Sequence, residues 1–212
     1  MPTLALSMIM RDAAATLARC LESARPVVDE MVIADTGSTD ETVQLARQFG
    51  ARVFSIPWEN DFAHARNRAL EEIRSEWVLV LDADEVRDPA AARIPALLTR
   101  AEVAGYLVPI HNYVLSLSER LWDRPAKPNH SELHMARNYQ AYVEHENVRL
   151  FRRLPGIQFV GRVHETVGSS ILGSGRKLGR ADFVIHHFGL AADADTRPQK
   201  HPLSRARSRK NS

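Results

Sequence analysis

The stretch that most constrains the fold is 77–85, where five apolar residues run directly into three carboxylates. An unbroken apolar run rich in Val and Leu is typical of a strand buried on both faces of a parallel sheet. Because a buried strand cannot hold charge in its interior, Asp82, Asp84 and Glu85 must emerge where the strand ends. In open α/β sheets, ligands bind at this carboxyl edge.

The spacing of these three acids suggests a ligand. Carboxylates this close together repel one another unless a cation or protons offset their charge. The stretch therefore predicts a divalent metal at the strand tip, with a phosphate-bearing ligand beside it. The pattern alone fits a polar turn with solvated acids equally well, since acidic turns are common.

Composition narrows the class of protein. With 212 residues, 44% of them hydrophobic and 25% charged, the chain can bury one substantial core. The single cysteine, Cys20, excludes an internal disulfide framework and fits a reducing compartment. Basic residues concentrate at 205–210, so the rest of the chain is near neutral and nucleic acid is not an expected partner. We see no transmembrane segment. We expect a cytoplasmic protein, with peripheral association at the inner membrane face left open.

Strands and helices alternate through the first half. Apolar runs predict strands at residues 4–10, 31–34, 51–56 and 77–81, and helical periodicity predicts helices between them, the third over 61–74. Ser38 and Glu41 have the spacing of a capping box at the start of the second helix. This alternation is typical of βαβ units and a parallel sheet. We therefore predict a Rossmann-like α/β layer over about residues 1–110.

The second half, about residues 111–190, is less regular. The first half ends with a predicted helix around 94–101 and a strand at 105–110, and within the second half we predict strands at 148–152, 158–163 and 182–187. Residues 116–147 are polar and lack periodicity, which is typical of a functional loop or lid. Residues 191–212 contain few large apolar side chains, so we expect a disordered basic tail.

Together these segments resemble the family 2 glycosyltransferases, and within them the bacterial members related to lipopolysaccharide core glucosyltransferases and peptide S-glycosyltransferases. Eight blocks in the family's order carry the resemblance over about residues 4–190. They are Ser7-Met-Ile-Met-Arg-Asp12, Asp35-Thr-Gly-Ser-Thr-Asp40, Trp58-Glu-Asn-Asp-Phe62, Ala65-Arg-Asn67, Asp82-Ala-Asp84-Glu85, Arg149-Leu-Phe-Arg152, Gly161-Arg-Val-His-Glu165 and His187-Phe-Gly189.

The resemblance implies a GT-A fold, which is a mostly parallel Rossmann-like sheet flanked by helices, with a small acceptor-side β region. It implies a single domain over residues 1–190. The implied activity is inverting transfer of a sugar from a nucleotide donor, with UDP the expected nucleotide, to a glycan, lipid-linked or peptide acceptor. A divalent cation, Mn²⁺ or Mg²⁺, would assist by offsetting charge on the leaving diphosphate.

The resemblance also implies roles for donor-side residues. Asp82 and Asp84 match the family's DxD pair, with Asp84 as a metal ligand and Asp82 reaching the donor ribose or a metal-bound water. His187 matches a histidine that completes the metal shell, although a core histidine describes it as well. Asp35 matches the carboxylate that accepts from a base N–H, as uracil offers. Arg66 matches an arginine near the base and pyrophosphate, although a rim salt bridge also fits it.

On the acceptor side, Glu165 follows a glycine in the family's His-Glu block. Inverting transfer needs a base that removes a proton as the acceptor attacks, and Glu165 is the candidate. The other reading is a loop carboxylate that binds acceptor hydroxyls without taking a proton. Arg149 and Arg152 could offset donor phosphate charge, because guanidinium groups match phosphate geometry, or they could equally pair with surface acids.

Two departures from the family pattern bear on activity. Asp12-Ala13 stands where relatives often have Asn-Glu, and Leu190 replaces a tyrosine before an unrelated tail. We expect this altered end to impair acceptor binding. Two alternatives to the transferase follow. One is a truncated, non-catalytic protein that binds nucleotide sugars. The other is a phosphohydrolase of the haloacid dehalogenase type, in which Asp82 would attack phosphorus.

Overall fold

The computed structural model of the chain describes residues 1–89 and 94–189. Its strands are β1 (Leu4–Met10), β2 (Glu30–Asp35), β3 (Arg52–Ser55), β4 (Trp77–Val80), β5 (Glu85–Arg87), β6 (Val103–Val114), β7 (Arg120–Leu121), β8 (Arg124–Pro125), β9 (Lys127–Pro128), β10 (Ala141–Arg152), β11 (Lys177–Arg180) and β12 (Ile185–His187). Its helices are α1 (Ala14–Ala24), α2 (Thr42–Gln48), α3 (Phe62–Glu71), α4 (Ile94–Leu98) and α5 (Gly168–Gly173), with a 3-10 turn η1 (His134–Ala136).

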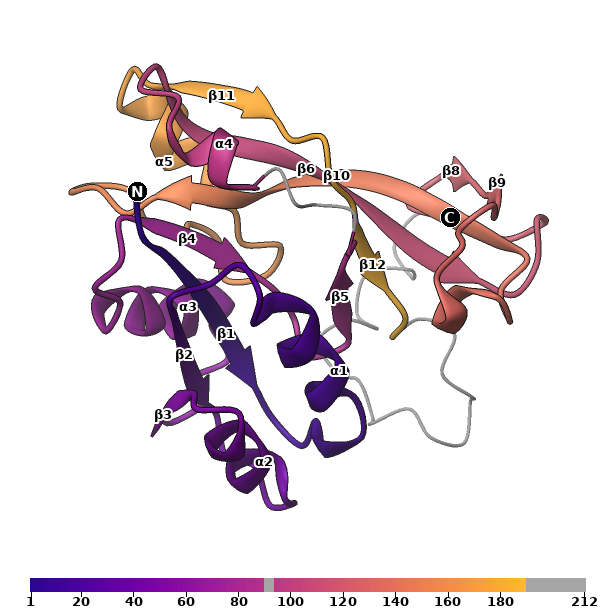
Figure 1. Ribbon diagram of the computed structural model, residues 1–212, viewed down its shortest axis with the longest axis horizontal. Coiled ribbons are helices and arrows are strands. Elements are labelled where there is room, and N and C mark those ends of the chain that lie inside the picture. The colour runs from indigo at the N-terminus through magenta and orange to yellow at the C-terminus, as the bar shows by residue number, and fades with distance from the viewer. Residues whose placement is uncertain (90–93, 190–212) are drawn as a thin grey trace, which may run out of the picture.

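Within the described residues, ten strands form one curled sheet (Figure 1). Its main path runs β3-β2-β1-β4-β10-β6-β12-β5. The first four strands of this path are parallel, which confirms the predicted βαβ layer. β10 then runs antiparallel to both β4 and β6, and β12 returns parallel to β6. The predicted α/β class is confirmed, with a sheet that is parallel in its first half and mixed in its second.

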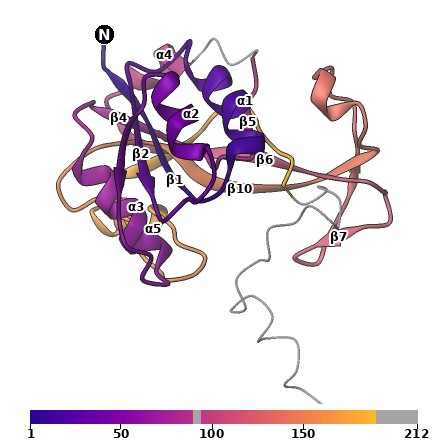
Figure 2. The same cartoon turned by 90° about the horizontal axis from the view of Figure 1, so that it is seen from below.

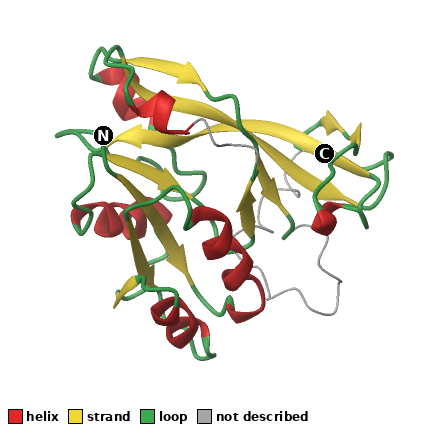
Figure 3. Cartoon of the chain, in the orientation of Figure 1, coloured by secondary structure: helices red, strands yellow, loops and turns green. Residues whose placement is uncertain are grey.

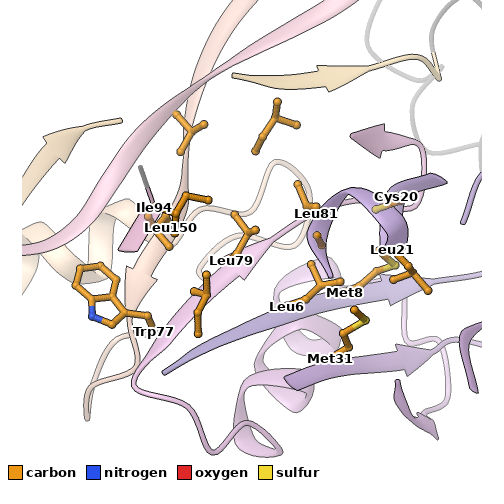
Figure 4. Close-up of a cluster of buried hydrophobic side chains, with 14 of the residues drawn as sticks. Leu6, Met8, Cys20, Leu21, Met31, Trp77, Leu79, Leu81, Ile94 and Leu150 are labelled. Atoms are coloured by element: carbon orange, nitrogen blue, oxygen red, sulfur yellow. The ribbon is translucent and has the colours of Figure 1, made fainter. Parts of the chain in front are cut away.

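Helices cover both faces of this sheet (Figures 2 and 3). Leu6, Leu79 and Leu81 point to the face covered by α1, where they pack with Cys20 and Leu21 (Figure 4). Their neighbours along the strands, including Val78 and Val80, point to the opposite face and pack with residues of α3 and α5. Because successive side chains of a strand alternate between faces, the same strands pack one set of side chains against α1 and the other set against α3 and α5.

The outer half of β10 was not predicted. The polar stretch expected to be a loop contains the first seven residues of this strand, and β10 pairs with β6 over most of its length. The two strands extend away from the helices as a long hairpin (Figure 1). In the outer half most β10 side chains are only partly buried, and Glu144 and Glu146 bear charge. The strand therefore lacks the apolar alternation by which a sequence reveals one.

Several other predictions of local structure were wrong. Residues 158–163 form only an isolated bridge, between Val160 and Thr166, rather than a strand. The strands β5 and β11 were missed because each is short and contains charged residues.

The expected basic tail at 191–212, and the departure at Leu190, lie outside the described residues. In the part of the chain that the structure describes, no helix has the length and apolar character needed to cross a bilayer.

Candidate functional site

A cleft of about 780 Å³ opens at the carboxyl ends of β1 and β4. This is the sheet edge at which open α/β folds bind ligands. Its lining comes from the segment after β1, from α3, from the turn after β4 and from the loop before α5. The lining residues are Ile9, Met10, Arg11, Asp12, Ala13, Ala15, Thr16, Phe62, Arg66, Asp82, Ala83, Asp84, Val163, His164, Glu165 and Gly189.

Asp82 lies in this cleft between two arginines. It lies two positions beyond the end of β4, and its contact with Arg66 places it on the face of the sheet that α3 covers. There Arg66 of α3 donates from Nη2 to Asp82 Oδ1 at 2.7 Å, and Arg149 of β10 donates from Nη2 to Oδ2 at 3.2 Å. Burial alone would raise the pKa of Asp82, but the two guanidinium groups lower it far below its usual range. Asp82 is therefore an ionised carboxylate with a partner on each oxygen.

Glu85 lies behind this pair and supports it. The residue is 2% exposed, and its carboxylate accepts from Arg149 Nη2 at 2.8 Å and from the backbone N–H of Asp82 at 2.9 Å. Burial raises the pKa of Glu85 to about 7, against the opposing effect of Arg149. Glu85 thus fixes the turn that carries the two aspartates.

Asp84 faces His187, the last residue of β12. His187 Nε2 lies 3.3 Å from Asp84 Oδ2, and His187 Nδ1 lies 2.8 Å from Asn112 Oδ1. A Cβ atom at Gly189 would collide with Asp84 Oδ2 and come within 3.0 Å of His187 Nε2. The space beside these two side chains is therefore open only because position 189 has no side chain.

Asp84 and His187 fit a divalent cation as a pair of ligands. A carboxylate oxygen and an imidazole nitrogen are both common ligands of Mn²⁺ and related ions. Among the residues that the structure describes, no group of three or more His, Cys, Asp or Glu side chains could hold a metal ion. A cation bound here would therefore take its remaining ligands from water and from phosphate oxygens, as Mg²⁺ commonly does.

Glu165 reaches the cleft on a short loop. Val160 and Thr166 close this loop with two backbone hydrogen bonds, and His164 within it has a φ of 63°. A positive φ is uncommon for a residue other than glycine and indicates a backbone held by its surroundings. Glu165 Oε1 accepts from Arg66 Nε at 2.6 Å. One arginine therefore joins Glu165 to Asp82.

Asn67, the neighbour of Arg66, binds the backbone just before this loop. Its side-chain amide donates to the carbonyl of Phe159 at 3.0 Å and accepts from the N–H of Phe159 at 2.8 Å. Both hydrogen-bonding groups of one backbone position are thereby satisfied by one side chain. Two adjacent residues of α3 therefore hold this part of the chain. Arg66 binds Glu165 in the loop, and Asn67 binds Phe159 just before it.

Asp35 lies at the end of β2, level with Met10 of β1. It is buried, and its carboxylate accepts from the backbone N–H groups of Gly37 and Ser38 and from the Ser38 hydroxyl. The predicted capping box is therefore wrong, because the Ser38 hydroxyl binds Asp35 rather than the helix start. Asp35 shares the sheet edge with Asp82 but is not among the residues that line the cleft.

The two remaining arginines lie in different places. Arg149 is buried between Asp82 and Glu85. Arg152 lies opposite Trp77, at the other end of β4, where its guanidinium lies 4.6 Å from the centre of the Trp77 ring. The proposed phosphate contact of Arg152 is therefore wrong, since the side chain packs far along the strand from the acids.

Two residues near the site, Asn112 and His145, were not predicted to belong to it. Asn112 of β6 is 1% exposed and contacts both His187 and His145 of β10. Its only signal in the sequence was an amide within the mostly apolar run Val103–Val114, next to His111. A buried amide must find partners, so this position could have been recognised as part of a polar network.

Comparison with known proteins identifies a family model and relatives that match this chain in sequence. A family model described as Glycosyl transferase family 2 matches residues 7–155. A TPR repeat-containing protein of Synechococcus elongatus is 32% identical over 200 residues, which cover 91% of this chain and 44% of that relative. The prophage-derived glycosyltransferase SunS of Bacillus subtilis is 32% identical over 87 residues, covering 40% of this chain and 21% of SunS. The chain thus spans less than half the length of these curated relatives.

Solved structures show the same fold. The structure of Staphylococcus aureus TarS, residues 1–349, aligns with a TM-score of 0.52 over 88% of this chain and 60% of that one. The sequences are 14% identical over this alignment, so the similarity concerns the fold alone. The cleft, its two arginines and its carboxylates therefore lie in a chain with the architecture of that protein.

Proposed function

Because the chain belongs to glycosyltransferase family 2, we propose that it transfers a sugar from a nucleotide-sugar donor to an acceptor, with inversion and with a divalent cation. The observation that carries this proposal is that one cleft is lined by Asp84 together with the linked group of Asp82, Arg66 and Glu165. His187 contacts Asp84 beside that cleft. We expect a UDP-linked donor and Mn²⁺ or Mg²⁺. The acceptor would be a glycan, a lipid-linked molecule or a peptide.

On the donor side, Asp84 and His187 would hold the cation, which offsets the negative charge that collects on the departing diphosphate. Asp35, held rigidly by its own turn, would accept from the N–H of the base. Asp82 would hold a donor hydroxyl, a role that fits a carboxylate already fixed on both oxygens. Arg66 would contribute positive charge next to the diphosphate.

On the acceptor side, Glu165 would remove the proton as the acceptor attacks. Arg66 holds one of its oxygens at 2.6 Å, and the side chain is 14% exposed. A partly enclosed carboxylate with a fixed orientation fits the positional demand on a general base. Arg66 would then set the distance between the donor-side carboxylate and the acceptor-side base.

The phosphohydrolase alternative receives no support from this geometry. In that chemistry Asp82 would attack phosphorus, which requires a carboxylate oxygen free to approach the substrate. Both oxygens of Asp82 are instead paired with guanidinium groups. The pairing of Asp82 therefore favours the transferase over the phosphohydrolase.

We also propose that the chain works in the cytoplasm. Its single cysteine, Cys20, is a buried free thiol, which fits a reducing compartment. Association with the inner face of the membrane would bring it to a lipid-linked acceptor.

Titration calorimetry with UDP, with and without Mn²⁺, tests the proposal when it is followed by an assay for UDP release from UDP-glucose. We expect UDP to bind only weakly without Mn²⁺, and Asp84→Ala to abolish the effect of the metal. The matched control is Asp123→Asn, on the exposed turn between β7 and β8. Metal-dependent binding without UDP release, from any of a panel of donors, would favour the non-catalytic binding protein. Transfer that persists in Asp84→Ala would contradict the metal assignment.

A further inference from the structure

Asn112 lies where three neighbouring strands bring polar side chains together beneath the cleft. β6 carries Asn112 between β10 and β12, which carry His145 and His187. The amide contacts His187 Nδ1 through Oδ1 at 2.8 Å and His145 Nδ1 through Nδ2 at 2.8 Å. Its Nδ2 also donates to the backbone carbonyl of Val143 at 2.9 Å. At 1% exposure, Asn112 must find its partners within the protein.

These contacts determine which way the amide points. A backbone carbonyl can only accept, so the side of Asn112 that faces Val143 must be its NH₂ group. The carbonyl Oδ1 then faces His187. If the amide were reversed, two carbonyl oxygens would face each other at Val143, and the donor to His145 would also be lost. Such losses are costly at a buried position, because each unmatched polar group keeps its full desolvation penalty.

The orientation of Asn112 in turn determines the state of His187. Since Oδ1 can only accept, His187 Nδ1 must carry a hydrogen. In the neutral imidazole the other nitrogen, Nε2, then has a free lone pair. That lone pair faces Asp84 Oδ2, 3.3 Å away. Two acceptors that face each other at this distance repel unless a proton or a metal cation lies between them.

We infer that Asn112 is a positioning residue that holds His187 in its Nδ1–H tautomer, so that Nε2 and Asp84 are presented together as acceptors. The effect of this tautomer on a cation rests on the metal-assisted function proposed above, whereas the tautomer itself does not. Partners that fix a metal-binding histidine through its other nitrogen typically change metal affinity about 10–100-fold when removed. Asn112 meets that description through a contact at 2.8 Å.

Two substitutions separate the hydrogen bond from mere packing. Asn112→Leu removes the acceptor for His187 Nδ1 while keeping a side chain of similar size. Asn112→Asp keeps an acceptor for the Nδ1 hydrogen of His187 but loses the donors to Val143 and His145. It therefore separates the acceptor toward His187 from the rest of the polar contacts of Asn112. The control is Asn138→Leu, at an exposed turn residue. Thermal denaturation of each variant verifies that it is folded.

The direct measurement is the tautomer of His187, read from long-range ¹H–¹⁵N spectra of ¹⁵N-histidine-labelled protein without metal at pH 9. The signal is assigned by its loss in His187→Gln. We expect the Nδ1–H form in the wild type, in Asn138→Leu and in Asn112→Asp, and a shift toward Nε2–H in Asn112→Leu. An Nε2–H form in the wild type, or an unchanged Nδ1–H form in Asn112→Leu, would overturn the inference.

The second measurement is Mn²⁺ affinity in the presence of UDP, by titration calorimetry. We expect about a 10–100-fold loss in Asn112→Leu and a change of only a few-fold in Asn112→Asp. If Asn112→Leu fails to fold, the test rests on Asn112→Asp. A loss of Mn²⁺ affinity of about 10–100-fold in Asn112→Asp, with wild-type Mn²⁺ affinity in Asn138→Leu, would then count against the inference. A wild type with the Nδ1–H tautomer that binds no Mn²⁺ would support the tautomer assignment and contradict the proposed function instead.

Discussion

Arg66 Nε lies 2.6 Å from Glu165 Oε1, although the two residues are separated by 99 positions in the chain. The same guanidinium donates from Nη2 to Asp82. The three side chains meet because α3 covers the face of the sheet to which Asp82 points, and because Asn67 fixes the approach to the Glu165 loop on the same helix. A planar guanidinium with donors on several edges can serve two carboxylates at once.

Arg66→Lys tests the need for this geometry. A lysine keeps the positive charge but provides a single ammonium group, which cannot reach both carboxylates with the same geometry. We expect UDP release from UDP-glucose to fall by at least about 10-fold, because misplacement of a reacting group by about 1 Å can cost 100-fold. Stability should fall as well, since disruption of a buried ion pair costs about 3–5 kcal/mol when one partner is removed.

The matched control is Arg68→Lys, an exposed arginine two positions along α3 that pairs with Glu71. This substitution should change neither the rate of UDP release nor the stability of the fold measurably, because exposed ion pairs contribute little. Wild-type activity in Arg66→Lys would show that charge alone suffices at this position.

Glu165→Gln separates proton removal from donor binding. The amide oxygen of glutamine still accepts from Arg66 Nε, so the loop should keep its position. The side chain can no longer act as a base, and general-base catalysis typically contributes about 100–10,000-fold. We therefore expect UDP affinity in Mn²⁺ to stay within a few-fold of wild type, while UDP release from UDP-glucose falls by that factor.

Glu119→Gln, on the exposed segment between β6 and β7, is the control for loss of one carboxylate. Equal rates for Glu165→Gln and wild type would assign Glu165 to acceptor binding without proton transfer. A parallel loss of UDP affinity would place it on the donor side instead.

Gly189→Ala tests the space beside Asp84 and His187. The added Cβ would collide with Asp84 Oδ2 and lie 3.0 Å from His187 Nε2, so one of these groups must move. We expect the Mn²⁺-dependent gain in UDP affinity to be lost in calorimetry, with little change in the midpoint of thermal denaturation. Gly173→Ala, where a Cβ would meet no atom within 4 Å, is the control. Unchanged metal dependence in Gly189→Ala would place the cation elsewhere.

The sequence predicted the strand that carries the acids of this site better than the contacts between its distant side chains. The run 77–81 was recognisable because every side chain in it is buried, and such a strand must release its charged residues at its end. The structure agrees for Asp82 and Asp84, which lie in the turn between the end of β4 at Val80 and the start of β5. Glu85 differs, because it begins β5 and is buried, paired with Arg149. This conclusion needs only local sequence and the cost of burying charge.

The contacts between distant residues could not be predicted in the same way. Asp82 and Arg66 were each expected at the donor, but their contact depends on which face of β4 Asp82 occupies and on where α3 crosses it. Asn112 shows the same limit more clearly. Its partners Val143, His145 and His187 come from two other strands, one of which was largely assigned to a loop. Pairing order across a mixed sheet is not encoded in local periodicity.

The pH dependence of stability offers a test away from the cleft. Glu30, at the start of β2, accepts from the N–H groups of Arg74 and Ser75 and from the Ser75 hydroxyl, just before β4 begins. Burial alone would raise the pKa of Glu30, but the hydrogen bonds from Ser75 and Arg74 lower it below its ordinary value of 4.5. The folded state therefore binds this proton less readily than the unfolded state does.

Glu30 consequently stabilises the fold above pH 4.5, and its contribution is lost as the pH falls through the lowered folded-state value. We expect Glu30→Gln to reduce the free energy of unfolding by about 1–2 kcal/mol at pH 7, because hydrogen bonds to a charged group are stronger than those to an amide. The difference from wild type should shrink steadily as the pH is lowered below 4.5. Urea denaturation of wild type and Glu30→Gln from pH 7 to 3.5 measures this difference in the free energy of unfolding. The other acids titrate equally in both proteins, so their effect cancels in the difference. A difference that stays constant over this range would mean that packing, rather than the carboxylate charge, makes Glu30 important.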